Sequence, residues 1–260
     1  MANMAFLRAI IPMPALMLLA WKTSPGYRPS AKQIRTGALL GCLNFGCNLM
    51  LYSSYSYIPV GIATTLHFLY PLFVMLYHVV RHGERPDAAK WCGLLLGVLG
   101  AALLIEMGEG GLSPFGMVLA LVSGVLFAAY IIILQQEAED PLPLYRLMTV
   151  TSAAGGILCA AAGAALGSLT VSLTPQAWLF AAATALLVSI GGAAVFQAGV
   201  RLVGDKDAAV YSLLEPLTSI IFGLLLLNEM LTARKVVSCL LILTGLLITA
   251  LADVRAAKQK

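Results

Sequence analysis

The sequence predicts an all-α integral membrane protein whose nine transmembrane helices form two inverted repeats. Of its 260 residues, 60% are hydrophobic and 11% are charged, whereas a soluble domain has about 45–50% apolar and about 25% charged residues. Apolar runs of about twenty residues, the length that a membrane helix needs, recur along the chain. A proline and a glutamate also recur in the same order 145 positions further along the chain.

The predicted helices are the apolar runs between charged or turn-forming segments. These nine runs lie at residues 4–21, 36–57, 60–80, 89–107, 114–135, 145–167, 176–200, 207–228 and 236–252. Each is continuously apolar, which favours helices over barrel strands of about ten residues with alternating character. The five cysteines all fall inside the runs without C-x-x-C spacing. We interpret them as packing residues and expect neither a metal site nor a cofactor.

The basic residues predict the orientation, because cytoplasmic loops collect Lys and Arg. When alternate loops are assigned to opposite sides, one side holds 13 of the 16 basic residues, and Arg8, Arg234 and Lys235 fall on the other. This distribution predicts a multi-pass protein of the cell inner (cytoplasmic) membrane, with its C-terminus in the cytoplasm. It also accounts for the net charge of +4 without a nucleic-acid partner.

An internal repeat relates the two halves of the chain. The register of 145 residues pairs Pro71 with Pro216, Glu84 with Glu229, Lys90 with Lys235 and Gly100 with Gly245. We expect a first repeat over residues 1–107, a linker over 108–113 and a second repeat over 114–260. The partner of helix 114–135 would lie upstream of Met1, so each repeat is expected to have five helices, the first being absent here. An odd number of helices per repeat makes the repeats inverted.

Four segments carry a family resemblance: YPLFVMLYHVVRHGE, EPLTSIIFGLLLLNE, KWCGLLLGVLG and SCLLILTGLL. They resemble the EamA-type permeases of the drug/metabolite transporter superfamily. The resemblance implies ten helices in two inverted five-helix units, a central cavity and transport of small molecules. The first helix of that plan is expected to be absent from this sequence, either because the sequence starts downstream of the natural start or because the protein is a defective or unusual member of the family.

Polar residues within the runs are candidates for lining a substrate cavity, since polar groups in hydrocarbon are costly. At 100° per residue several of them share one face of their helix. The candidates are Asn44, Asn48, Tyr52, Tyr55, His67, Ser123, Phe127, Tyr130, Gln197, Tyr211, Glu215 and Thr218. The family resemblance implies that the same helices line the cavity. The alternative is hydrogen bonding between helices, at about 0.6 kcal/mol per bond.

Glu215 is the one carboxylate deep within a predicted helix, where an acidic side chain costs about 2.5–3.5 kcal/mol on insertion scales. Desolvation favours its neutral form, so Glu215 is the candidate for proton coupling or for pairing with a cationic substrate. Alternatively, a neighbouring side chain holds it for packing. His67 has the same two interpretations, a proton relay or a structural hydrogen bond. We expect Glu84 and Glu229, at helix ends, to be structural.

Glycine pairs with G-x-x-x-G spacing allow helix backbones to approach closely, either within the chain or across a homodimer. They are Gly37 and Gly41, Gly93 and Gly97, and Gly163 and Gly167. The acidic stretch QQEAEDPLP is expected to be a solvated loop.

These observations favour a secondary transporter, with export as the preferred direction, for small metabolites or drug-like compounds. No G-x-x-x-x-G-K-[ST] loop is present, so a proton gradient or substrate exchange would supply the energy. One alternative is a non-transporting scaffold or truncated remnant. An intramembrane enzyme is disfavoured, because the chain has no H-E-x-x-H and no G-x-S-x-G. The expected partners are a small-molecule substrate, the lipid bilayer and a second copy of the chain.

Overall fold

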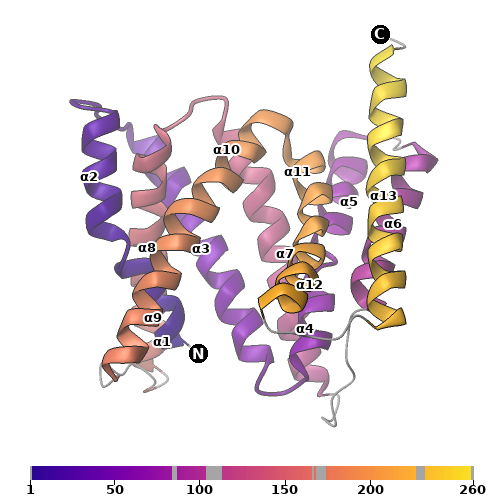
Figure 1. The fold of residues 1–260 in the computed structure, drawn as a ribbon. Helices are drawn as coiled ribbons and strands as arrows, with labels where there is room; N and C mark the ends of the chain where they lie inside the picture. The colour runs from indigo at the N-terminus through magenta and orange to yellow at the C-terminus, as the bar shows by residue number, and fades with distance from the viewer. Residues whose placement is uncertain are drawn as a thin grey trace. The chain divides into compact units, whose positions relative to one another are not determined.

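The computed structural model describes residues 2–83, 87–103, 113–165, 167, 174–226 and 232–258. Within these ranges every regular element is a helix (Figure 1). Six helical segments in the described part of the chain are long and apolar enough to cross a membrane. They are Met4–Thr23, Ala31–Ser54, Val60–His82, Pro114–Glu137, Leu144–Ala165 and Pro175–Val203. The prediction of a helical, multi-pass membrane protein is confirmed, and the count of nine spans stays a prediction.

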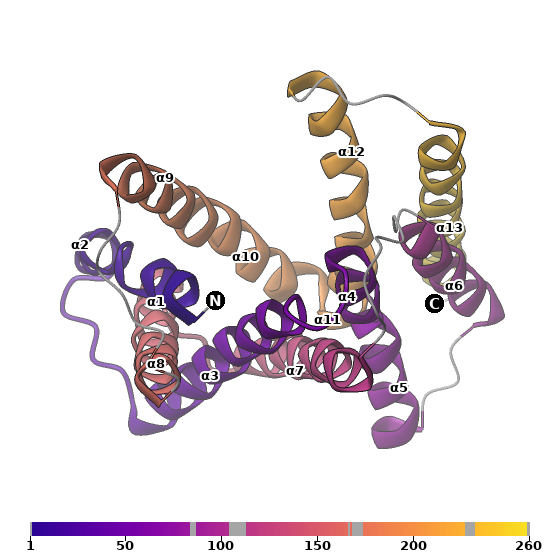
Figure 2. The same ribbon diagram turned by 90° about the horizontal axis from the view of Figure 1, so that it is seen from below.

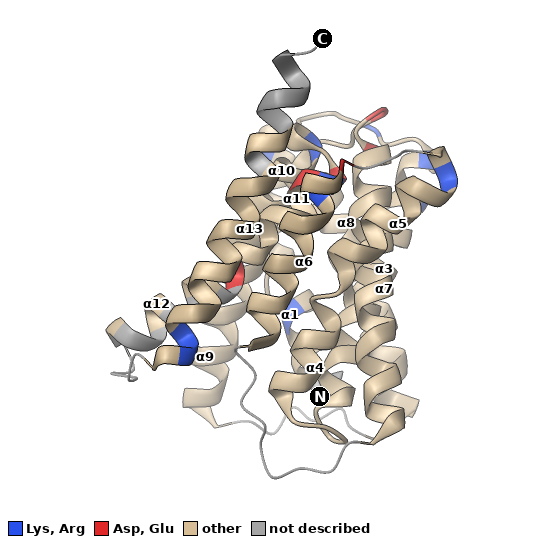
Figure 3. Cartoon of the chain, turned by 90° about the vertical axis from the view of Figure 1, so that its right-hand side faces the viewer, with Lys and Arg blue, Asp and Glu red and all other residues tan. Residues whose placement is uncertain are grey.

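The helices lie in the predicted runs, although the run 4–21 forms two helices and the run 176–200 contains a π-helix. In chain order they are α1 Ala2–Ile10, α2 Met13–Thr23, α3 Ala31–Ser54, α4 Val60–His67, α5 Tyr70–His82, α6 Ala88–Leu103, α7 Pro114–Glu137, α8 Leu144–Ala165, α9 Pro175–Leu186, the π-helix η1 Leu187–Gly192, α10 Ala193–Val203, α11 Asp205–Tyr211, the 3₁₀ turn η2 Ser212–Leu214, α12 Glu215–Leu226 and α13 Ala233–Lys258. Figure 3 shows that Lys, Arg, Asp and Glu residues lie mostly at helix ends and in the connecting segments.

Two predicted continuous helices are interrupted at equivalent places. The run 60–80 forms α4 and α5, and the run 207–228 forms α11, η2 and α12. Pro71 and Pro216 each occupy the second position of the following helix, where the missing N–H needs no partner. The starts of α4 and α11 are 145 residues apart, as are those of α5 and α12. Glu84 and Glu229 lie outside the described residues.

The chain folds into two compact units. Unit 1 comprises Met1–Ser53 and Ala129–Asp205, and unit 2 comprises Ser54–Ala128 and Lys206–Lys260. Each unit draws helices from both predicted repeats. The units of packing therefore differ from the predicted domains 1–107 and 114–260, which describe repetition in sequence and stay a prediction.

In unit 1, α1 and α2 pack against α8, and α1 also packs against α9 (Figure 2). Small residues allow α3 to approach α8. A Cβ at Gly41 would press on the backbone of Thr151, and one at Gly37 would lie 2.9 Å from Val150 Cγ1. This G-x-x-x-G pair therefore packs within the chain.

In unit 2, α6 lies along α13 (Figure 1). A Cβ at Gly93 would lie 2.5 Å from the carbonyl oxygen of Gly245, and one at Gly97 would lie 2.7 Å from Leu213 Cδ1. This second pair also packs within the chain. In the third pair, Gly163 is buried in α8. Gly167 has a φ of +59° just beyond that helix, with open space beside it.

Candidate functional site

The predicted polar stripe on α3 is a connected group in unit 1. Asn48 Nδ2 donates a hydrogen bond to the Asn44 carbonyl oxygen at 2.7 Å. Arg8 Nη1 donates to the Tyr52 hydroxyl oxygen at 2.6 Å and to Asn48 Oδ1 at 3.4 Å. All four residues are partly buried. The structure therefore brings together Asn44, Asn48 and Tyr52 around an arginine from α1.

Tyr55 does not extend this stripe. Helix α3 ends at Ser54, so Tyr55 lies in the turn that follows and belongs to unit 2. The predicted helix end at residue 57 was three residues too late.

Arg8 was missed as a site residue. It is the one charged residue in the run 4–21. A single charge within an apolar run could have identified it as a candidate site residue, but we used Arg8 only to predict the orientation. Its carbonyl oxygen accepts a hydrogen bond from Ser189 Oγ at 3.2 Å. Ser189 lies in the π-helix η1, and such π-helical turns occur frequently at functional sites.

A second pair in unit 1 joins α7 to α10. Gln197 Nε2 donates to the Tyr130 hydroxyl oxygen at 3.2 Å, and the Tyr130 ring stacks on Phe196 with centroids 6.4 Å apart. Both Tyr130 and Gln197 are about 2% exposed. This contact is of the kind expected if the two residues hold neighbouring helices together by hydrogen bonding.

His67, Ser123 and Phe127 form a cluster in unit 2. The Ser123 hydroxyl donates to the Ala120 carbonyl oxygen at 2.6 Å, and His67 Nδ1 lies 3.0 Å from the same Oγ. Because Ser123 has a single hydroxyl proton, the His67 ring nitrogen is the donor. The His67 ring also lies 5.4 Å from Phe127 and 5.5 Å from Tyr70, centroid to centroid. This cluster also fits the packing interpretation.

Tyr211, Glu215 and Thr218 surround the break between α11 and α12, and all three are exposed in unit 2. Because η2 interrupts the helix between Tyr211 and Glu215, they do not share one continuous helical face, as the projection at 100° per residue assumed. Thr218 Oγ1 donates to the Glu215 carbonyl oxygen at 2.8 Å. Glu215 is the first residue of α12, where the helix dipole favours a negative charge.

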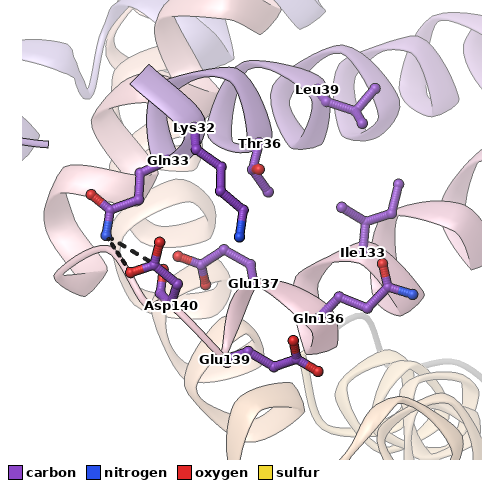
Figure 4. A pocket seen from close by; sticks show the side chains of 9 residues that line it. All are labelled: Lys32, Gln33, Thr36, Leu39, Ile133, Gln136, Glu137, Glu139 and Asp140. Atoms are coloured by element: carbon purple, nitrogen blue, oxygen red, sulfur yellow. Dashed lines mark hydrogen bonds between the residues drawn. The ribbon is translucent and has the colours of Figure 1, made fainter. Parts of the chain in front are cut away.

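A cavity of about 360 Å³ lies in unit 1, where the start of α3 meets the end of α7 (Figure 4). None of the predicted site residues lines it. Its lining residues are Lys32, Gln33, Thr36, Leu39, Ile133, Gln136, Glu137, Glu139 and Asp140. Gln33 Nε2 donates to Asp140 Oδ1 at 3.0 Å across this cavity.

The acidic stretch QQEAEDPLP is not wholly a solvated loop, contrary to expectation. Glu137 in this stretch is 5% exposed. It pairs with Arg201 at 2.5 Å and accepts a hydrogen bond from the Leu142 backbone N–H at 2.7 Å. The carboxylate therefore connects the end of α7 to α10. No local pattern in the sequence indicated this contact.

The chain matches the EamA-like transporter family over residues 1–106 and 114–251. It is 27% identical to the uncharacterized transporter sll1319 of Synechocystis over 74% of this chain and 60% of that protein. It is 26% identical to the uncharacterized transporter YvbV of Bacillus subtilis over 79% of this chain and 67% of that protein. It is 27% identical to the threonine/homoserine exporter RhtA of Salmonella typhimurium over 80% of this chain and 68% of that protein.

The chain thus spans 60 to 68% of the length of these curated relatives. A crystal structure that is 20% identical superposes with a TM-score of 0.79, covering 96% of this chain and 89% of that chain. At this level of identity the superposition shows a shared fold.

Proposed function

Since the chain belongs to the EamA-like transporter family, we propose that it is a secondary transporter that exports small metabolites or drug-like compounds. The family match, which covers most of both halves of the chain, is the observation that carries this proposal. The relatives named above are transporters, which favours a transport role over an enzymatic one. We place the protein in the cytoplasmic membrane with its C-terminus inside, because the basic residues are so unevenly distributed between the loops.

Two inverted repeats that alternate in their access to a substrate site would provide the mechanism. The family matches residues 1–106 and 114–251 separately, which supports two repeats. The equivalent starts of α4 and α11, and of α5 and α12, support the same division. In unit 2 the repeat-related helices α6 and α13 also pack on each other. The proposal includes nine membrane spans and an inverted arrangement of the two repeats.

The substrate would be small and would carry polar groups. The polar set around Asn48 in unit 1 and the exposed turn around Glu215 in unit 2 are our candidates for substrate contact and for proton coupling. Threonine and homoserine are the first compounds to test, because the relative RhtA is named as their exporter. A homodimer is not needed to explain Gly37, Gly41, Gly93 and Gly97, whose close contacts are made within the chain.

Transport by the purified protein in vesicles tests the proposal. A panel of labelled metabolites that includes L-threonine and L-homoserine would be measured with and without a pH gradient. We expect protein-dependent movement of at least one compound and acceleration by the gradient. Glu215→Gln should abolish the acceleration, whereas Glu139→Gln, which changes an exposed acid, should leave it intact.

Movement of no compound by a folded, monodisperse protein would favour the scaffold or remnant. Chemical conversion of a compound in place of movement would favour an enzyme. Gradient-driven transport that survives Glu215→Gln would leave the transporter proposal standing and remove Glu215 from the coupling step.

A further inference from the structure

Arg8 is a positively charged residue to which the proposed function assigns no role. It is the fifth residue of the apolar span Met4–Thr23, and its two side-chain partners, Asn48 and Tyr52, are both uncharged. Charged groups inside membrane proteins are usually paired, because an isolated charge in hydrocarbon is costly. The question is therefore which anion balances this arginine.

The helices around Arg8 cannot supply that anion. Helix α1 packs on α8 and α9, and α3 contributes the side-chain partners of Arg8 (Figure 2). Neither α3, α8 nor the whole segment Pro175–Val203 contains a single Asp or Glu. In unit 1 the acids are Glu137, Glu139, Asp140 and Asp205. Of these, Glu137 is paired with Arg201 and Asp140 is bound by Gln33.

The backbone of Arg8 also lies deep relative to a neighbouring span. Its carbonyl oxygen accepts from Ser189, which is equally far in sequence from Pro175 and Val203, the two ends of that span. Arginines that merely extend toward headgroups keep the guanidinium in water, but Arg8 Nε has no contact with water and no hydrogen-bond partner among the described residues. The Nε side of the guanidinium is therefore enclosed by the unit, although Arg8 as a whole is only partly buried.

The hydrogen bonds leave one edge of the guanidinium available. Tyr52 and Asn48 both accept from Nη1. Nε, which shares the adjacent edge with Nη2, is buried and has no hydrogen-bond partner within the part of the chain that the structure describes. Two parallel N–H groups on one edge match the two oxygens of a carboxylate. A single positive charge with neutral neighbours suits a singly charged carboxylate better than a doubly charged phosphate.

We propose that Arg8, oriented by Tyr52 and Asn48, binds the carboxylate group of the transported compound. The substrate class is then small carboxylic acids, including zwitterions that carry a carboxylate. This inference rests on the proposed transport function, because Nε is closed off from water in this conformation and the ligand would reach it during the transport cycle.

Matched pairs of ligands test the proposal. L-Threonine, L-lactate and benzoate would each be compared with its amide, which keeps the carbon skeleton and removes the negative charge. Binding to the full chain in detergent would be measured by ligand-dependent thermal stabilisation, and transport would be measured in vesicles. We expect at least one acid to bind more tightly than its amide, by about ten- to a hundredfold.

Variants assign that preference to the arginine. Arg8→Gln should abolish the difference between acid and amide, and Arg8→Lys should keep part of it, because the charge remains without the planar fork. Arg35→Gln removes the same charge from an exposed position of α3 and should have no effect. Should Arg8→Gln fail to fold, Tyr52→Phe provides a second test, since it removes the acceptor that orients the guanidinium. It should weaken acid binding by about three- to tenfold.

The inference and the proposed function fail separately. Equal binding of acids and amides by the wild-type protein, or an acid preference that survives Arg8→Gln, would overturn the assignment of Arg8 even if transport is observed. Loss of acid preference in Arg8→Gln without transport of any compound would support the anion site and count against the transporter. Preferential binding of inorganic phosphate would overturn the choice of a carboxylate.

Discussion

The two broken helices of unit 2 share a backbone plan and differ in the residue that precedes the shared proline. Helix α4 is followed by a turn and then by α5, which begins Tyr70–Pro71, and α11 is followed by η2 and then by α12, which begins Glu215–Pro216. The prolines explain the shared break, because proline is tolerated in the first turn of a helix and disfavoured further inside. Architecture has thus been kept at these two places while the residue before the proline has changed.

The surroundings of Tyr70 and Glu215 explain that change. Tyr70 is 1% exposed and packs edge to face on Phe127 at 4.7 Å, whereas Glu215 is exposed at the first turn of α12. Residues at equivalent positions therefore have different surroundings, since Tyr70 is buried against an aromatic ring and Glu215 is exposed.

Replacing Tyr70, the buried residue of this pair, should lower the stability of the protein the most. Tyr70→Ala is expected to lower the free energy of unfolding by about 3–5 kcal/mol, because it removes a buried aromatic ring and leaves a cavity. At the equivalent position, Glu215→Ala should change it by no more than about 0.5 kcal/mol. Thermal and chemical unfolding of the two variants in the same detergent measures the difference. Equal losses would mean that the two positions are not distinguished by packing.

The segments that precede α4 and α11 differ as well, because Arg201 in α10 corresponds in the register of 145 to Ser56, which lies in the turn after α3. Arg201→Gln leaves the buried Glu137 carboxylate without its cation and should cost about 3 kcal/mol. Adding Glu137→Gln should recover part of that loss. Unfolding of the single and double variants measures the coupling, and strictly additive losses would show that the ion pair contributes little.

The repeat-related glycines Gly100 and Gly245 test the packing of α6 on α13. A methyl group at Gly245 would lie 2.8 Å from the Gly97 backbone nitrogen, and one at Gly100 would lie 2.8 Å from Ile242 Cγ1. Each alanine variant should lose about 1–3 kcal/mol. Gly199→Ala is the control, because open space surrounds that helical glycine. It should be neutral or stabilise by up to about 1 kcal/mol.

Removing the Ser123 hydroxyl, which lies beside His67, should have a smaller effect on stability. Ser123→Ala removes the acceptor of His67 Nδ1 and should cost about 1 kcal/mol. The matched control is Ser212→Ala, because Ser212 corresponds to His67 in the repeat and its hydroxyl donates to the Ala208 carbonyl oxygen one turn earlier, a bond within its own segment. That control should change the free energy of unfolding by less than about 0.5 kcal/mol. If Ser123→Ala leaves the free energy of unfolding unchanged, the contact with His67 does not stabilise the protein.

Hydropathy predicted where the helices lie, because the thickness of a bilayer sets their length. The run 145–167, for example, forms α8 from Leu144 to Ala165. The repeat register predicted that residues 60 and 205, and 70 and 215, would have equivalent places, and the helix starts agree. Both inferences depend on local or periodic features, which a single sequence displays directly.

Contacts between helices that are distant in the sequence were harder to predict. Asn48 and Tyr52 were identified from one helix face, but their partner Arg8 is 40 or more residues away. The ion pair between Glu137 and Arg201 spans 64 residues. The interruption at η2 also displaced Tyr211 from the face that a continuous helix would give it. Such pairings depend on how helices pack, and no periodicity in the sequence encodes them.

Counterflow in vesicles tests the central claim, transport by alternating access, most directly. Vesicles that contain the full chain would be loaded with an unlabelled compound identified in the panel, and the labelled form would be added outside at a lower concentration. The account predicts transient accumulation of label above the level in protein-free vesicles. The absence of accumulation by a protein with a normal unfolding transition would contradict it.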